Sequence, residues 1–399
     1  MLAPTIDSMT ATERRAGVSL AAIFGLRMLG LFLILPVFSV YAPTLAGGDD
    51  VLLVGLALGA YGLTQAFFQI PYGMASDRWG RKPVIVAGLL LFAAGSFLAA
   101  SADSLYWVIA GRIIQGAGAI SAAVTALAAD LTREQHRTKV MAMIGATIGL
   151  VFALSLVAAP VLYAAIGMPG IFALTGALAL AAIVLLLKAV PSPPPAVARG
   201  RVPFSSVLLH GQLARLNFGV LALHMMQTAL WVVVPPLLVA VGGLAVTEHW
   251  KIYLPAVLLS FVVMVPAIIL AEKRGRMKMV FVGAVSLLTL VQAGLATLAG
   301  GLYSVGAWLM IFFVGFNILE ALQPSLISRI APPEAKGAAL GVYNTTQSIG
   351  LFLGGVVGGW LLKHHGAHAV QWFCAALGFI WLVLAATMVP PARTVGKTT

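Results

Sequence analysis

Twelve apolar stretches, each long enough to cross a bilayer as a helix of about 20 residues, dominate this sequence. They cover roughly 18–42, 51–75, 84–101, 105–129, 138–163 and 168–190 in the first half, and 216–241, 250–271, 279–300, 304–330, 337–362 and 368–389 in the second. Only 9% of the residues are charged, far below the share of about 25% in globular proteins. The sequence therefore predicts an all-α integral membrane protein with twelve transmembrane helices.

Basic residues fall almost entirely in alternate loops between these stretches. Twenty lysines and arginines belong to one set of loops, and two, Lys251 and Lys363, belong to the other. Cytoplasmic loops of membrane proteins carry such an excess of basic residues, so both termini are predicted to be cytoplasmic. The net charge of +12 then reports topology, and we expect no nucleic-acid partner.

A hydrophilic segment divides the chain into two parts. Residues 191–215 begin PSPPPAVARGRVP and carry three arginines, which is typical of a basic, proline-rich linker. We expect this linker to lie in the cytoplasm between two six-helix halves, residues 1–190 and 216–399. No part of the linker is expected to fold as a separate domain.

A charged motif recurs in both halves. Residues 73–83 read GMASDRWGRKP, and the stretch PYGMASDRWGRK at 71–82 is echoed by PAIILAEKRGRMK at 266–278. With an offset of 195 residues, Glu272 corresponds to Asp77, Lys273 to Arg78 and Arg276 to Arg81. The recurrence at equivalent places in the topology predicts two pseudo-symmetric halves.

Twelve spans in two halves, with GMASDRWGRKP between the second and third, resemble the major facilitator superfamily. GRIIQGAGA at 111–119 is similar to the fourth-helix motif of its proton-linked drug-efflux branch, with Arg112 at the position of that motif's arginine. LRMLGLF at 26–32 and FNILEALQPSLIS at 316–328 resemble the bacterial YajR group of efflux transporters. One departure weakens the link to the drug-efflux branch, because Ala159 and Pro160 stand where its fifth-helix motif has Gly-Pro. The resemblance implies the major facilitator fold in a bacterial inner membrane.

The charged motif is predicted to act as a conformational switch. Asp77 and Arg81 are four residues apart, so they share a helix face and can pair, and Asp130 offers a second acid. The resemblance implies that Asp77 also faces the start of the eleventh helix near Gly341, latching the halves together in the outward-open state. The alternative is that the charged cluster determines only the topology, by keeping its loop in the cytoplasm. The candidate switch residues are Gly73, Asp77, Arg78, Gly80, Arg81, Lys82 and Asp130.

Glu320 is the only acidic residue in the interior of any predicted span. A charge in the bilayer core is costly, so such a residue is a functional candidate, and an apolar environment favours the protonated form of a carboxylic acid. We expect Glu320 to couple transport to protons; the alternative is a structural ion pair with a basic residue of another span. Arg112 is assigned to proton coupling from the resemblance alone.

Arg27 is the other charge within a span, and two roles remain open for it. It could bind an anionic group of a substrate, or it could donate hydrogen bonds to backbone carbonyls. The polar and aromatic residues at helical spacing are each as compatible with interhelical hydrogen bonding as with a substrate cavity. These cavity candidates, with Arg27, are Tyr61, Gln65, Gln69, Gln115, His224, Gln227, Trp231, Asn317, Asn344 and Gln347.

These features favour a secondary active transporter that exports a small molecule in exchange for protons by alternating access. No phosphate-binding loop occurs, so we expect no cofactor and a drive from the proton gradient, and one chain suffices as a monomer. A metal site is not expected, because His224 has no ligand one turn away and Cys374 is the only cysteine. One glutamate and one isolated histidine also argue against an enzyme. The alternatives are a facilitator or symporter in which Glu320 is structural, and a sensor that binds a substrate without transporting it.

Overall fold

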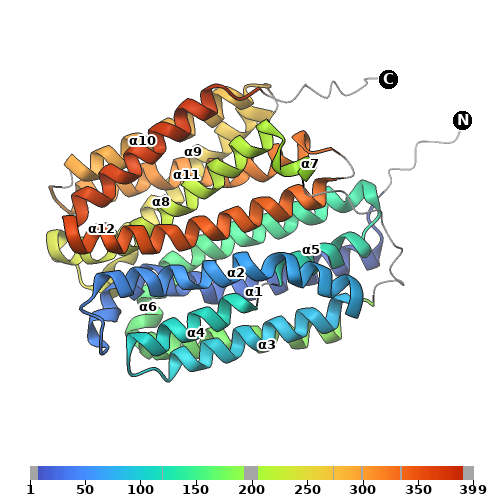
Figure 1. The fold of residues 1–399 in the computed structure, drawn as a ribbon, viewed down its shortest axis with the longest axis horizontal. Coiled ribbons are helices and arrows are strands. Elements are labelled where there is room, and N and C mark those ends of the chain that lie inside the picture. The colour runs from blue at the N-terminus through green and yellow to red at the C-terminus, as the bar shows by residue number, and fades with distance from the viewer. Residues whose placement is uncertain are drawn as a thin grey trace, which may run out of the picture.

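The computed structural model describes residues 8–118, 120–192, 205–272, 274–297, 300–332 and 335–389. Residues 193–204 of the predicted linker and Lys273 of the repeated motif lie outside these ranges. The described chain is a bundle in which long helices lie alongside one another (Figure 1). Its elements are α1 (Ala11–Tyr41), η1 (Ala42–Thr44), α2 (Val51–Trp79), α3 (Arg81–Ala100), α4 (Leu105–Ala117), α5 (Ser121–Asp130), α6 (Glu134–Ala189), α7 (Ser205–Leu208), α8 (Gly211–Gly242), η2 (Val246–Glu248), α9 (Trp250–Glu272), α10 (Met277–Thr297), α11 (Leu302–Ile330) and α12 (Lys336–Ala386).

Ten helical stretches within the described residues are long and apolar enough to cross a membrane, and two of them are 51 residues long. These two belong to α6 and α12, and each is interrupted by a glycine with non-helical backbone angles. Gly167 has φ 66° and Gly366 has φ 79°, a region that only glycine enters readily. Each long stretch therefore holds two segments of spanning length, which is consistent with the twelve predicted spans.

Helix packing shows that the chain reverses direction at both glycines. α1 runs parallel to the segment of α6 before Gly167 and antiparallel to the segment after it. In the same way, α8 runs parallel to the first segment of α12 and antiparallel to the second. The contacts that establish these directions are Gly17 with Val140, Gly25 with Thr147, Gly30 with Thr175 and Arg15 with Lys188 for α1, and Gly350 with Leu221, Gly354 with Met225, Gly358 with Ala229 and Gly219 with Trp381 for α8.

The fourth predicted span, 105–129, is not one continuous helix. α4 ends at Ala117 and α5 begins at Ser121, with Gly118 in a non-helical conformation between them. A Cβ on Gly118 would lie 2.4 Å from the carbonyl oxygen of Gly88 on α3, so this close approach requires glycine. The predicted span agrees with the structure, since Leu105–Asp130 is long and apolar enough to cross a membrane, but the helix within it is interrupted next to Gly118.

Two other boundaries differ from the predicted ones. α1 begins at Ala11, before the apolar stretch, because the Thr10 and Glu13 side chains form a reciprocal capping box with each other's backbone amides. α8 begins at Gly211 and not at 216, with the His210 side chain at its N-cap. Polar residues near a cap can therefore extend a helix beyond its apolar core.

Large apolar side chains cover much of the outer surface. Phe67, Leu150, Val262 and Phe379 are each more than 60% exposed. Soluble proteins rarely expose contiguous apolar surface on this scale, whereas a bilayer solvates it. This surface matches the prediction of a protein embedded in lipid.

The two halves meet along α2 and α12, and this seam has two unlike ends. One, here named the Asp50 end, holds the start of α2; the other, the Asp77 end, holds the end of α2. At the Asp50 end the backbones are in direct contact, since a Cβ on Gly55 would lie 2.1 Å from the carbonyl oxygen of Gly355. Toward the Asp77 end the helices diverge, and a Cβ on Gly341 would meet no atom within 4 Å.

Candidate functional site

The charged motif at the Asp77 end is held together by Arg81. Its guanidinium lies 2.5 Å from the Asp77 carboxylate and 2.9 Å from that of Asp130, and it donates a hydrogen bond of 2.7 Å to the Ser76 hydroxyl. Gly80 supplies the turn between α2 and α3 with φ 91°. The structure thus brings together the acids and the base that the spacing predicts, while Lys82 donates to the carbonyl oxygen of Val190.

Among the residues that the structure describes, none of the other half makes the predicted contact with Asp77 in this conformation. The Asp77 side chain is 65% exposed, and a Cβ on Gly341 would meet no atom within 4 Å. Gly73 likewise makes no close helix contact, because a Cβ there would meet only Ala122, at 3.6 Å. The switch role of these residues therefore stays a prediction that concerns another conformation.

The echo of the motif in the second half pairs differently. Glu272 at the end of α9 accepts a hydrogen bond of 3.0 Å from Arg329 at the end of α11, whereas its counterpart Asp77 pairs within its own motif. In the first half the motif supplies the base, Arg81, and the fourth span supplies the acid, Asp130. In the second half these signs are exchanged, so the duplicated sequence supports ion pairs of opposite polarity.

The Asp50 end also holds an ion pair between the halves that the sequence did not single out. Lys363 on α12 lies 2.7 Å from the Asp50 carboxylate, which also caps α2 by accepting a hydrogen bond from the Leu52 amide. The ion pair lowers the pKa of Asp50 below its ordinary value, with the hydrogen bond from Lys363 as the main cause. The available signal was the rarity of Lys363, one of only two basic residues in the other set of loops.

Glu320 on α11 contacts His224 on α8. Its carboxylate oxygen Oε1 lies 3.0 Å from Nε2 of the imidazole, and the side chains are 30% and 4% exposed, respectively. The Gln347 amide nitrogen, from α12, lies 2.6 Å from the same Nε2. Three predicted residues from separate helices of the second half are thereby brought to one point.

Hydrogen bonding assigns the proton on the other nitrogen of His224. Nδ1 lies 3.0 Å from the carbonyl oxygen of Val220, which can only accept, so Nδ1 carries a hydrogen. The neutral ring then presents a lone pair at Nε2, whereas the protonated ring presents a donor toward Glu320. The Gln347 amide can donate to the neutral ring and, after rotation, accept from the protonated ring. The arrangement can therefore hold one proton between an imidazole and a carboxylate.

Arg27 lies in the first half, among neutral partners. Its Nη2 donates to the Tyr61 hydroxyl at 2.5 Å, to Gln65 Oε1 at 3.2 Å and to the carbonyl oxygen of Gly118 at 3.5 Å. The side chain is fully buried, and among the described residues its Nε and Nη1 atoms have no hydrogen-bond partner. The guanidinium also lies 5.3 Å from the centre of the Phe92 ring.

Arg112 is also buried, but its hydrogen bonds are satisfied. It donates to the backbone carbonyl oxygens of Ala57 and Leu58 at 3.2 and 3.4 Å, and to Gln115 Oε1 at 2.9 Å. All of these partners belong to the first half, and in the described part of the chain no hydrogen bond or ion pair joins Arg112 to Glu320. The predicted pair of proton-coupling residues is thus not brought together, and the contacts of Arg112 match a role in holding α2 against α4.

The remaining cavity candidates take varied positions. Asn317 donates a hydrogen bond of 2.9 Å to the Ser260 hydroxyl and so joins α11 to α9. Gln69 is buried with both amide atoms unpartnered, and Trp231 is buried with an unpartnered indole nitrogen. Gln227 is buried, and Asn344 is half-buried on α12.

An aromatic cluster joins the halves and was missed in the sequence. Phe152 of α6 lies 6.2 Å from Phe313 and 5.7 Å from Phe316 on α11, measured between ring centres. Phe313 in turn contacts Trp231, and Phe316 contacts the ring of His224. Phenylalanines are common in apolar spans, so no sequence signal marked these as lying between the halves.

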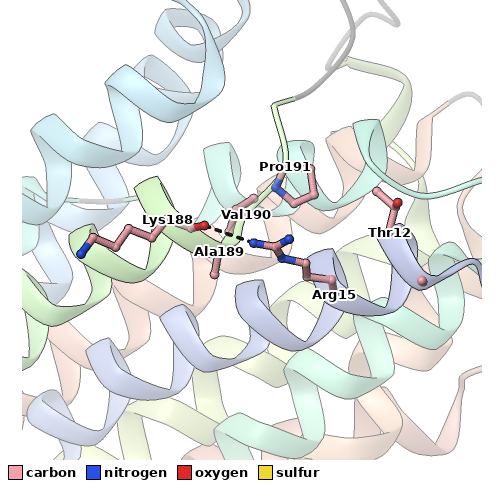
Figure 2. A pocket seen from close by; sticks show the side chains of 7 residues that line it. Thr12, Arg15, Lys188, Ala189, Val190 and Pro191 are labelled. Carbon is pink, nitrogen blue, oxygen red and sulfur yellow. Dashed lines mark hydrogen bonds between the residues drawn. The ribbon is translucent and has the colours of Figure 1, made fainter.

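A cavity of about 500 Å³ lies apart from all of these residues, between the start of α1 and the end of α6. Figure 2 shows Arg15 directed across it to the backbone oxygen of Lys188, with the Lys188 amino group pointing away. None of the predicted cavity residues lines it. Its lining is Ala11, Thr12, Arg15, Lys188, Ala189, Val190 and Pro191.

Comparisons with known proteins agree with this architecture. The Major Facilitator Superfamily matches residues 20–355 and 317–399. Inner membrane transport protein YajR of Escherichia coli (strain K12) is 44% identical over 388 residues, which cover 96% of this chain and 85% of that protein. Multidrug resistance protein MdtH of Aeromonas hydrophila is 27% identical over 387 residues, covering 94% of this chain and 92% of that protein.

Solved structures share the fold at low sequence identity. The human organic anion transporter MFSD10 is 18% identical with a TM-score of 0.71, covering 94% of this chain and all of the other. A variant of the nucleoside transporter NupG is 14% identical with a TM-score of 0.72, covering 94% of this chain and 99% of the other. On the family match, the relatives and the fold together, this chain belongs to the major facilitator superfamily and is a membrane transporter, not an enzyme.

Proposed function

We propose that this protein exports a small molecule across the bacterial inner membrane in exchange for protons, by alternating access. The observation that carries the proposal is the contact between Glu320 and His224, with the Gln347 amide beside it. An acid and an imidazole from different helices can take up and release one proton as those helices move. The multidrug resistance relatives support the direction, efflux, and the inner membrane relative supports the location.

The seam between α2 and α12 supplies the conformational part of the proposal. If the basic loops are cytoplasmic, the Asp50 end faces the periplasm and the conformation is inward-facing. The outward-facing conformation then opens at the Asp50 end and brings Asp77 toward the start of α12, where the helix dipole favours a carboxylate. The cycle needs no cofactor, and one chain forms the whole pathway.

The test uses proteoliposomes that contain a pH-sensitive dye and face a library of metabolites and drugs under an imposed pH gradient. We expect one class of compound to trigger proton movement through the wild type. Glu320→Gln should reduce this movement to background, because an amide cannot carry the proton. Glu272→Gln is the matched control, since it removes an acid of the same half that lies at the Asp77 end, and it should keep the movement.

Other results would point to the alternatives. Transport of a compound by Glu320→Gln with wild-type proton coupling would make Glu320 structural and would place the coupling elsewhere, as in a symporter that does not use Glu320. Transport of a compound by the wild type without any proton movement would indicate a facilitator. A compound that binds, as measured by a thermal shift, but neither crosses the membrane nor moves protons would indicate a sensor.

A further inference from the structure

The first half contains a buried positive charge without a counter-charge. Arg27 is fully buried, and two of its nitrogens, Nε and Nη1, have no hydrogen-bond partner. Across the part of the chain that the structure describes, no carboxylate lies within ion-pair distance of Arg27 or of Arg112. A buried cation whose donors are unmatched is strongly unfavourable in a membrane, so this arrangement is suited to a negative partner.

A second unmatched donor lies on the same side of α2 as the residues that contact Arg27. Tyr61 and Gln65 bind Arg27, and Gln69 follows Gln65 by four residues, so it belongs to the same helix face. The Gln69 side chain is 1% exposed, and neither its nitrogen nor its oxygen has a partner. Buried side-chain amides are ordinarily hydrogen-bonded, so the unmatched Gln69 also indicates a missing ligand.

The helix break in the fourth span lies at the same place. Arg27 reaches the carbonyl oxygen of Gly118, and α5 begins three residues later, at Ser121, without a side-chain cap. The first amides of a helix lack partners within the helix and carry a partial positive charge. A guanidinium and a helix N-terminus together are a favourable environment for an oxyanion.

We propose that the site formed by Arg27, Gln69 and the start of α5 binds an oxyanion group, a carboxylate, sulfonate or phosphate, of the transported molecule. The inference rests on the proposed transport function and adds the chemical class of the substrate. The oxyanion replaces the neutral acceptors Tyr61 and Gln65 on Arg27. The rest of the molecule is apolar or aromatic, in keeping with the Phe92 ring beside the guanidinium.

A hydrogen-bonded connection links this site to the second half. Gln65, which accepts a hydrogen bond from Arg27, donates a hydrogen bond of 2.8 Å to the Ser348 hydroxyl on α12. The preceding residue, Gln347, contacts His224 at the Glu320 site. When the oxyanion displaces Gln65 from Arg27, the bond to Ser348 is affected, and α12 carries that change to the residues that hold the proton.

The experiment measures binding to the intact, detergent-purified chain by isothermal titration calorimetry. The probes share one ring and differ in charge: 2-naphthoate and 2-naphthalenesulfonate are anions, 2-naphthamide is neutral and 2-naphthylmethylammonium is a cation. We expect the two anions to bind more tightly than the other probes. Arg27→Gln should weaken the binding of the anions about 10-fold to 100-fold, as expected for lost hydrogen bonds to a charged group. Arg215→Gln removes an arginine that contacts only its own helix, and it should bind like the wild type.

Two further variants keep the test decisive if Arg27→Gln does not fold, as judged by size-exclusion chromatography. Arg27→Lys retains the charge and should retain the preference for anions. Gln69→Leu should weaken the binding of the anions without changing the binding of the other probes. Equal binding of all four probes, or tighter binding of the cation, overturns the proposal. So does wild-type anion binding by folded Arg27→Gln.

The outcome is separable from that of the proposed function. If a cationic compound drives proton movement that depends on Glu320, the transport proposal stands and the oxyanion site fails. If the anions bind at Arg27 but no compound moves protons, the oxyanion site stands and proton exchange fails.

Discussion

The two ends of the α2–α12 seam differ although the same two helices form both. At the Asp50 end, glycines bring the backbones into contact and Lys363 pairs with Asp50. At the Asp77 end the helices are apart, and Asp77 pairs with Arg81 of its own half. The comparison indicates that the halves come into contact where glycines of the two helices face one another. Ion pairs contribute less to this contact.

The largest effect on the ratio of closed to open molecules is expected from placing a large side chain in the backbone contact at the Asp50 end. In Gly55→Leu the new side chain would begin 2.1 Å from the carbonyl oxygen of Gly355, so the backbones must separate. A penalty of about 3 kcal/mol, the upper end for overpacking, lowers the ratio of closed to open molecules about 100-fold. Double electron–electron resonance between labels at Thr44 and His365, both exposed at the Asp50 end, measures that ratio.

Gly283→Leu is the matched control for this variant, because a Cβ on Gly283 meets no atom within 4 Å. It should leave the distance distribution unchanged. If Gly55→Leu also left the distribution unchanged, the backbone contact would not determine closure of the Asp50 end.

A smaller effect is expected at the open end. Asp77→Asn removes the charge that is proposed to face the start of α12 in the outward-facing conformation. Charges at helix N-termini are worth about 0.3–1 kcal/mol, so the outward-facing share should fall about two-fold to five-fold. Labels at Lys139 and Lys336, exposed on α6 and α12, report the separation at this end. Equal distance distributions for Asp77→Asn and the wild type would contradict the latch.

The smallest effect is expected from the ion pair at the closed end. The Asp50 and Lys363 side chains are 31% and 39% exposed, and such pairs contribute about 0–1 kcal/mol. Lys363→Gln should therefore shift the population at most about five-fold toward opening of the Asp50 end. This variant keeps the Asp50 cap of α2, which Asp50→Asn would weaken.

The same ion pair predicts the pH dependence of closure. Because Lys363 lowers the pKa of Asp50 from its ordinary value of 3.8, the pair contributes fully above 3.8 and is lost as the pH falls through the lowered pKa. Between about pH 8 and about pH 5, this ion pair should cause no change in the distribution of distances between labels at Thr44 and His365. An additional opening should appear only below about pH 4, and it should be absent in Lys363→Gln.

Local features were well predicted from the sequence, and features of helix packing were not. The spans, the duplicated motif and the pairing of Arg81 with Asp77 depend on residues close in the chain. The contact of Glu320 with His224, the connection from Gln65 to Ser348 and the break at Gly118 depend on how separate helices face one another. The candidate residues were named, yet their partners were not.

The sequence by itself determined that this chain is an all-α membrane protein and predicted twelve spans in two related halves, because apolar length and basic loops act locally. Only the tertiary structure decided which residues meet between helices. Most of the long helices are apolar on every side, so no amphipathic stripe indicates which face of α2 or α12 points inward. In lipid both faces are equally well solvated, and the rotation of each helix is set by close packing at glycines and by a few buried polar contacts.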